Sequence, residues 1–429
     1  MKEWFAVIKK KMRKYIFCHI LFHLSSENPY FPHIDIFIIF AADFLFPKMG
    51  KFEDIGPYDF EGTRAAYFRL MEDARFHEAV AKCLPGYPMQ SLREVLDQAH
   101  SVYDIQQGFI RKIVEVFVKI STKGVALQGI EHLPDDKAYL FISNHRDITF
   151  DPAMLEYYFF ITNRQTTKIC IGNNLLSTPL VEELGRANKM IVVKRDSADI
   201  RERLANFQQL SEYIQYSLFE EKESVWIAQR DGRTKNGDDY TKQGLLKMIT
   251  MGHSKDLLKT IKAMNIVPMT ISYEYEPCDA LKAREEAMKE LGHYEKQPGE
   301  DFNSIKQGVF QQKGRVSLVL GTPLNEELDQ IDPDLHNNLK LDAVCKLIDG
   351  QIYQNYQLYP NNYIANDLLH DTTHYSAYYN EEDKQKFQEY LQLKSVCPDV
   401  SQEKMMHYLL RIYGTPVDNY YHKPIHERQ

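Results

Sequence analysis

A histidine and two carboxylates follow one short apolar segment of the chain. Residues 139–142 have the length and composition of a buried strand, and the polar residues 143–147, which include His145 and Asp147, come directly after them. Asp151 and Pro152 then give a helix-start signal, a carboxylate at the N-cap followed by proline at the first helical position. A histidine and a carboxylate held on the two sides of such a turn can act as an oriented general base. The turn is therefore a candidate catalytic site.

His145, Arg146 and Asp147 also spell the HRD sequence of the protein-kinase catalytic loop. That loop requires an asparagine five residues after its aspartate, where this chain has Pro152. No DFG sequence or glycine-rich loop flanks the segment in the arrangement that a kinase needs. We therefore exclude a protein kinase.

Two more strand-like segments end in polar clusters. Residues 190–193 lead into a pair of cations, and residues 225–228 lead into a turn with a carboxylate, a glycine and several cations. Cations at a strand terminus suit a phosphate dianion, although the first cluster is also consistent with a solvated strand end and the second, taken alone, is more often an exposed turn. Parallel strands place their carboxyl ends on one edge of a sheet, so the three polar clusters are expected to meet. The residues concerned are Lys194, Arg195, Asp231, Gly232 and Arg233.

Strands and helices alternate from residue 125 to about residue 324, which predicts an α/β fold with a largely parallel sheet covered by helices. Helical patterns on either side predict a helical N-terminal layer and a helical C-terminal extension. The N-terminal helices are equally consistent with covering one face of the sheet. The predicted strands are 139–142, 168–171, 190–193, 225–228, 266–273 and 316–320. The expected divisions are 1–48 as an extension, 49–124 as the helical layer, 125–335 as the α/β domain and 336–429 as the helical extension, with a mobile tail after Gly414.

Residues 1–48 differ from the rest of the chain. Basic residues precede two apolar stretches, and neither stretch reaches the 18–20 or so apolar residues that span a bilayer. Such a segment could lie in a membrane interface. We favour a second interpretation, in which Met49 is the true start and the residues before it are an upstream extension.

Composition excludes several classes of protein. The 429 residues carry a formal net charge of −8, which argues against general nucleic-acid binding. Six cysteines occur without CxxC pairs, which indicates reduced thiols in the cytoplasm and not a disulfide scaffold. His19 with His23, and His370 with His374, have a metal-ligand spacing but no further ligand nearby, so we expect neither a metal site nor a cofactor.

Four motifs occur in order between residues 129 and 323, after the lead-in GIEHLP at 129–134. With them, the chain resembles the glycerolipid acyltransferase family, which includes glycerol-3-phosphate and lysophosphatidate acyltransferases. The motifs are Asn144-His145 with Asp151-Pro152, VVKR at 192–195, DGRT at 231–234 and IVPM at 266–269.

The chain departs from the family pattern at two positions. Five residues separate His145 from Asp151, where the family usually has four. The extra residue leaves Asp147 as an alternative partner for the histidine, although the helix-start signal favours Asp151. Asp231 replaces the usual glutamate of the third motif, so the carboxylate is one methylene shorter. That change bears on the identity of the acyl acceptor more than on the chemistry.

The resemblance implies a mechanism and a set of roles. His145 would take a proton from the acceptor hydroxyl as that hydroxyl attacks an acyl thioester, and Asp151 would hold the imidazole. Arg195, with Lys194 as a second cation, would bind the phosphate of the acceptor. The third motif, Asp231 to Arg233, would position the glycerol backbone. Asn144 and Arg146 are expected to complete the substrate site.

The same resemblance implies the partners of the protein. The donor would be acyl-CoA or acyl carrier protein, and the acceptor a lysophospholipid, 1-acylglycerol-3-phosphate, or glycerol-3-phosphate. The protein would act in phospholipid biosynthesis as a peripheral protein at the cytoplasmic membrane surface. Two alternatives stay open: O-acylation of another lipid hydroxyl, such as that of an aminoacyl lipid, and a lipid-binding relative that has lost turnover.

Overall fold

The computed structural model describes residues 50–176, 178–195 and 197–422. The predicted extension, residues 1–48, lies outside these residues. The chain divides into two structural units at residue 54, and every element named below belongs to the second, Ile55–Gln429. Among the described residues, no helix is both long enough and apolar enough to cross a bilayer.

A seven-stranded sheet lies at the centre of this unit, in the order β1-β7-β6-β2-β5-β3-β4. All neighbouring strands run parallel except β6 and β7, which are antiparallel. The predicted largely parallel sheet is therefore confirmed. The strands are β1 Gly124–Gln128, β2 Leu140–Ser143, β3 Lys168–Gly172, β4 Met190–Val193, β5 Val225–Ala228, β6 Ile266–Tyr273 and β7 Arg315–Leu320. The short edge strand β1 was not predicted.

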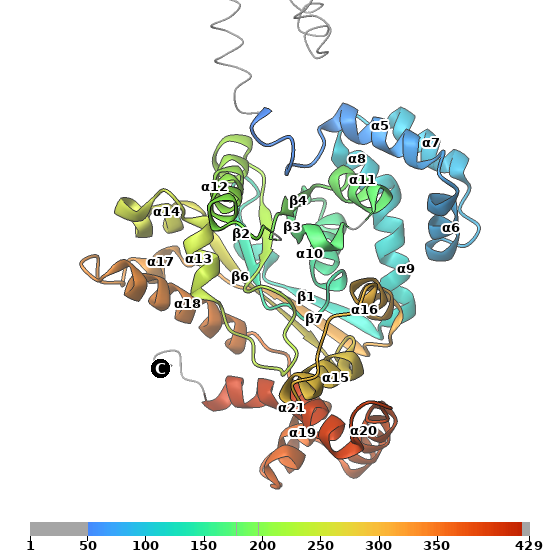
Figure 1. Cartoon of the computed structure of the whole chain (residues 1–429), viewed down its shortest axis with the longest axis vertical. Helices are drawn as coiled ribbons and strands as arrows, with labels where there is room; N and C mark the ends of the chain where they lie inside the picture. The colour runs from blue at the N-terminus through green and yellow to red at the C-terminus, as the bar shows by residue number, and fades with distance from the viewer. Residues whose placement is uncertain (1–49, 177, 196, 423–429) are drawn as a thin grey trace, which may run out of the picture. The chain divides into compact units, whose positions relative to one another are not determined.

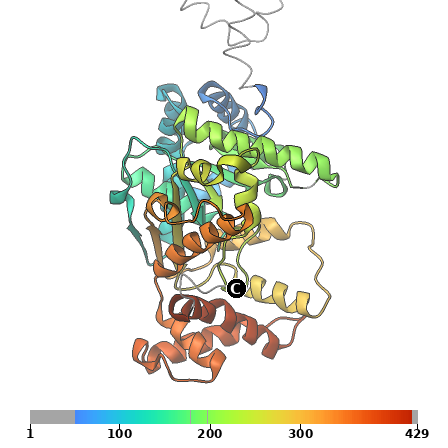
Figure 2. The same cartoon turned by 90° about the vertical axis from the view of Figure 1, so that its left-hand side faces the viewer.

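Helices cover both faces of the sheet (Figure 1). One face packs against α9 and α10 in an apolar core that includes Phe141, Val267 and Met269 of the strands and Phe150 and Met154 of α10. The other face is covered by α12, α13 and α18, which lie in front of the sheet in Figure 2. These helices are α9 Arg111–Ser121, α10 Phe150–Ile161, α12 Ile200–Tyr216, α13 Gln243–Ile249 and α18 Asn337–Gln354; α14 Leu257–Ala263 lies between α13 and β6 in the chain.

The helices before β1 form a second apolar core, to which Ala187 of the later helix α11 also belongs. Leu92 and Leu96, one turn apart on α7, pack there with Tyr67 of α5 and Phe109. The last helix of the layer, α9, also packs on the sheet through Val114. The layer therefore combines the two arrangements that the sequence left open. Its helices are α5 Phe60–Leu70, α6 Ala74–Cys83, α7 Met89–Gln98, α8 Val102–Ile105 and α9 Arg111–Ser121.

The C-terminal part is helical, as predicted, but it extends further than the sequence pattern indicated. α21 continues through Gly414 to His422, and Val417 is buried, so the prediction of a mobile tail after Gly414 is wrong over these residues. Gly414 is needed because a side chain there would meet the backbone of Asn366 on α19 at about 3.1 Å. The helices not yet given are α11 Pro179–Ala187, which precedes β4, and those after β6: α15 Asp279–Glu290, α16 Glu300–Phe310, α17 Asn325–Leu328, α19 Pro360–His370, α20 Glu381–Lys394 and α21 Gln402–His422.

Candidate active site

His145 and Asp151 meet across the turn between β2 and α10. Nδ1 of His145 lies 2.9 Å from Oδ2 of Asp151, and the carboxylate is fully buried. The same oxygen accepts the backbone N–H groups of Arg146 at 2.6 Å and Asp147 at 2.9 Å. The other oxygen accepts the hydroxyl of Tyr273, at the end of β6, at 2.6 Å. With Nδ1 donating to Asp151, Nε2 of His145 carries the lone pair that can accept a proton.

Asp147 has a different place, so the alternative partner is excluded by geometry. Its Oδ1 accepts the backbone N–H groups of Thr149 and Phe150 at 2.9 and 2.7 Å and thereby caps the start of α10. Its Oδ2 faces Gly308 of α16, where a Cβ would lie 2.0 Å away. Asp151 is thus the partner of His145 that the sequence pattern favoured, whereas the cap predicted at Asp151 is supplied by Asp147, because the helix begins at Phe150 and not after Asp151.

His145 faces a cavity of about 1400 Å³. The edge of its ring meets that of Trp226 with 5.8 Å between the centroids. One part of the cavity is polar and is lined by side chains that follow β4 and β5. The other part is apolar and runs between α10, α11 and the N-terminal helices. Its apolar lining includes Phe76, Val80, Phe109, Ile113, Val114, Phe117, Ala153, Phe160, Leu180 and Leu184.

The polar clusters after β4 and β5 meet at the cavity, as predicted. Arg195 forms an ion pair with Asp231, and both line the cavity with Gly232 and Arg233. Nη1 of Arg233 is buried and has no hydrogen-bond partner among the described residues. Gly232 has φ +72, a backbone conformation that favours glycine. Lys194 is half-buried and does not belong to the cavity lining, so the structure separates it from Arg195.

Asn144 and Arg146 are not in the cavity lining, which corrects their prediction as substrate contacts. Both side chains are buried and donate to the same oxygen, Oδ2 of Asp239. Their polar groups are therefore used inside the protein. Asn144 and Arg146, on the two sides of His145, are thus held by a buried carboxylate of the protein.

A carboxyl group lies in the apolar part of the cavity. Glu156 is on α10, on the face that carries Ala153, and its carboxyl accepts the N–H and the hydroxyl of Thr167. Burial raises the pKa of Glu156 to about 7, against the hydrogen bonds from Thr167 and the charge of Lys189. Gln106 lines the same region and accepts the hydroxyl of Thr166 through its Oε1 atom.

Several residues of the site were missed by sequence reasoning. Tyr273 could have been found, because it ends a predicted strand whose neighbour carries the histidine. Asp239 gives no such signal, since nothing in the sequence separates it from Asp238. Further cations in the cavity lining, beyond the motifs, are Arg203, Arg230, Lys235, Lys242 and Lys296.

Comparison with known proteins agrees with the acyltransferase that the sequence motifs predict. Residues 124–272 match the family model described as Acyltransferase. No curated protein matches the chain. Among solved structures, the crystal structure of the 1-acyl-sn-glycerophosphate (LPA) acyltransferase PlsC from Thermotoga maritima is similar, with 14% identity and a TM-score of 0.34 over 67% of this chain and 93% of that one. A TM-score this low adds nothing to the fold described above.

The matched segment runs from the start of β1 into β6, as far as residue 272, and therefore contains the turn with His145 and Asp151 and the clusters after β4 and β5. Residues 124–272 form an acyltransferase domain, and the protein is an acyltransferase.

Proposed function

We propose that the protein transfers a fatty acyl group from an acyl thioester to a hydroxyl of 1-acylglycerol-3-phosphate or glycerol-3-phosphate, in phospholipid biosynthesis. The observation that carries this proposal is the cavity that joins His145 to both a cationic region and an apolar region. Its volume of about 1400 Å³ exceeds the range of about 300–1,000 Å³ that is usual for small-molecule sites, so it can hold an acyl chain together with a polar acceptor.

His145 is the general base of the proposed reaction. Nε2 takes the proton of the acceptor hydroxyl while the oxygen attacks the thioester carbonyl, and Asp151 stabilises the imidazolium that forms. When the tetrahedral intermediate collapses, the C–S bond breaks and the thiolate receives the proton from His145. The products are an ester and a free thiol. No nucleophilic serine or cysteine is required, because the acceptor attacks directly.

Arg195 and Arg233 are proposed to bind the acceptor phosphate. Arg195 is paired with Asp231 at the exposed end of the cavity, and a phosphate can share its guanidinium, which has five donors. Arg233 brings a buried nitrogen that has no partner among the described residues. Asp231 and Gly232 remain in place to contact the glycerol hydroxyls. The apolar part of the cavity takes the acyl chain, where Glu156 and Gln106 are its polar exceptions.

The exposed surface beside the cavity supports action at a membrane surface. Ile200 and Leu204 on α12 are 62% and 50% exposed, and Arg203 and Phe207 of the same helix line the cavity. Apolar side chains next to cations suit the boundary between lipid head groups and acyl chains. We therefore propose a peripheral protein at the cytoplasmic face of a membrane, which can take lipid acceptors from the bilayer.

The test is thiol release from palmitoyl-CoA and from palmitoyl acyl carrier protein in the presence of a panel of acceptors. We expect release that depends on 1-acylglycerol-3-phosphate or glycerol-3-phosphate and a product that contains the new ester. Release that depends only on an acceptor without phosphate, such as an aminoacyl lipid, would replace the proposed acceptor class. Binding of acceptors with no thiol release from either donor would identify a non-catalytic relative and overturn the proposal.

A further inference from the structure

Asp239 connects the residues on both sides of the catalytic histidine. Its carboxylate is fully buried, and its Oδ2 accepts Nδ2 of Asn144 at 2.9 Å and Nε and Nη2 of Arg146 at 3.0 and 2.8 Å. Its Oδ1 accepts the hydroxyl of Thr234 at 2.5 Å, and the backbone N–H of Thr234 donates to the carbonyl of His145 at 2.7 Å. A displacement of Asp239 therefore reaches residues 144, 145 and 146 at once.

The other contacts of Asp239 come from the C-terminal helices. Tyr356, which follows α18, donates its hydroxyl to Oδ2 at 2.7 Å, and the hydroxyl of Tyr353 on α18 donates to the backbone carbonyl of Asp239. The loop that carries Asp239 also approaches α21 closely. At Gly237, with φ +77, a Cβ would lie 2.6 Å from the carbonyl oxygen of Ile412, so no side chain fits there.

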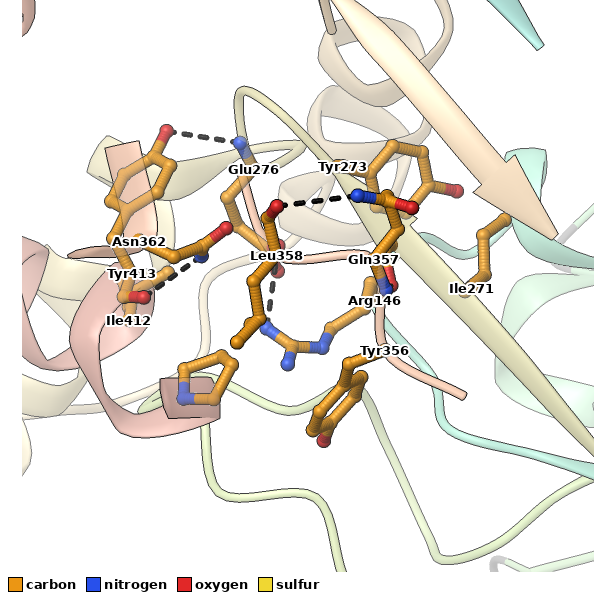
Figure 3. Close-up of a pocket in the computed structure, with 12 residues that line it drawn as sticks. Arg146, Ile271, Tyr273, Glu276, Tyr356, Gln357, Leu358, Asn362, Ile412 and Tyr413 are labelled. Atoms are coloured by element: carbon orange, nitrogen blue, oxygen red, sulfur yellow. Dashed lines mark hydrogen bonds and ion pairs between the residues drawn. The ribbon is translucent and has the colours of Figure 1, made fainter. Parts of the chain in front are cut away.

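A second link runs through Glu276. Arg146 reaches Glu276 at 3.3 Å, and Lys282 of α15 donates to both Glu276 and the carbonyl of Arg146 at 2.6 Å. The hydroxyl of Tyr413 on α21 accepts the backbone N–H of Glu276 at 2.9 Å and donates to the carboxylate of Asp279 at 2.8 Å. Figure 3 shows Arg146 between Tyr356 and Glu276 at a small cavity of about 20 Å³, room for one water.

The charges in this group balance. Two cations, Arg146 and Lys282, face two carboxylates, Asp239 and Glu276, and all four side chains are buried. Burial by itself raises the pKa of Asp239. The charge of Arg146 and three hydrogen bonds outweigh that effect and lower the pKa below its usual value, so the carboxylate stays ionised. Removing one partner of such a buried pair leaves the other charge uncompensated, which is strongly unfavourable.

We infer that Asp239, held by Tyr356 from the C-terminal helices, is a positioning residue for His145. The C-terminal helices thereby act on the catalytic turn, although they lie outside the matched acyltransferase segment, residues 124–272. The kinetic test of this inference depends on the proposed function, because it measures acyl transfer. Positioning predicts a loss in kcat with little change in KM, because the substrates contact the cavity lining and not Asp239 or Tyr356.

The test compares Tyr356→Phe and Asp239→Asn with Tyr375→Phe, a buried tyrosine of the same extension that makes no contact with Asp239. Circular dichroism and thermal unfolding establish that each variant is folded at the assay temperature. We expect kcat to fall on the order of 10-fold in Tyr356→Phe and 100-fold in Asp239→Asn, with KM for donor and acceptor within about twofold of wild type. Tyr375→Phe should keep the kcat of the wild type.

Hydrogen exchange gives a second readout that does not need turnover. The amide hydrogens of the peptide that covers residues 140–150 should exchange faster than in the wild type in Tyr356→Phe and Asp239→Asn. Their exchange rate in Tyr375→Phe should equal that of the wild type. Folded variants with wild-type kcat and wild-type exchange in this peptide would overturn the inference. If the wild type releases no thiol, the proposed function fails, and the exchange of residues 140–150 still decides whether Asp239 holds the turn.

Discussion

Replacing Asp151 by asparagine separates the charge of this side chain from its position. Three N–H donors converge on Oδ2, from His145, Arg146 and Asp147, while Oδ1 accepts the hydroxyl of Tyr273. The asparagine oxygen can take the place of Oδ2, and its NH₂ group can donate to the Tyr273 oxygen, which has lone pairs available. The turn should therefore stay folded while the negative charge beside His145 is lost.

The size of the effect follows from the charge that forms on His145 during the reaction. The imidazolium is stabilised by a buried carboxylate 2.9 Å from Nδ1, and asparagine replaces that ion pair by a neutral hydrogen bond. Neutralising the carboxylate of a histidine base costs about 10⁴ in kcat in serine proteases, and we expect a loss of about 10³–10⁴ here. That loss corresponds to about 4–5.5 kcal/mol of transition-state stabilisation.

The assay is thiol release from palmitoyl-CoA at saturating acceptor, with circular dichroism to establish the fold. Asp147→Asn is the matched control, since its amide oxygen can still accept the N–H groups of Thr149 and Phe150 that Oδ1 caps. We expect the control to retain kcat within a few-fold. A folded Asp151→Asn variant with kcat within 10-fold of wild type, or a larger loss in Asp147→Asn, would refute the assignment of the partner.

Three further variants test other parts of the site. Arg195→Ala should raise KM for a phosphate-bearing acceptor by 10-fold or more and leave KM for the acyl donor unchanged, as initial rates over both substrates would measure; an equal rise for both would contradict its phosphate role. Val80→Phe, in the apolar part of the cavity, should shift the preference to shorter acyl chains in a chain-length series of acyl-CoA donors, and an unchanged preference would place the chain elsewhere. Glu156 has a pKa raised from 4.5 to about 7, so its stabilising contribution is complete below pH 4.5 and is lost as the pH rises through 7. In the wild type, the free energy of unfolding should therefore fall by up to about 3 kcal/mol between pH 4.5 and 8 because of this group, and Glu156→Gln should remove that fall. An equal dependence of the unfolding free energy on pH in both proteins would count against this prediction.

The main features of the fold could be predicted from the sequence because the strands are short apolar runs between clear helical patterns. Residues 190–193 and 225–228 were placed to the residue, as β4 and β5. The edge strand β1 was missed because its apolar run is only three residues long and its positions alternate between exposed and half-buried. The end of α21 was missed because Gly414 and Pro416 are typical helix-ending residues. Here the glycine instead allows α21 to contact α19.

The residues of the site could be predicted where their positions follow from the end of a strand or a strand-to-helix turn. The pairing of His145 with Asp151 follows from their places on one strand-to-helix turn, and the meeting of Arg195 with Asp231 and Arg233 follows from the rule that parallel strands end at one edge. The roles of Asn144 and Arg146 could not be predicted, because their partner Asp239 lies about 90 residues away and resembles any loop aspartate. Long-range burial of charge leaves no short-range pattern in a sequence.

The central claim is that His145 takes the proton from the acceptor hydroxyl. The most direct measurement is the initial rate of thiol release from palmitoyl-CoA with 1-acylglycerol-3-phosphate, for wild type and His145→Ala at equal concentrations of folded protein. We expect the variant to keep the fold and to fall to the rate without enzyme. A His145→Ala protein that transfers the acyl group at the wild-type rate would contradict the account.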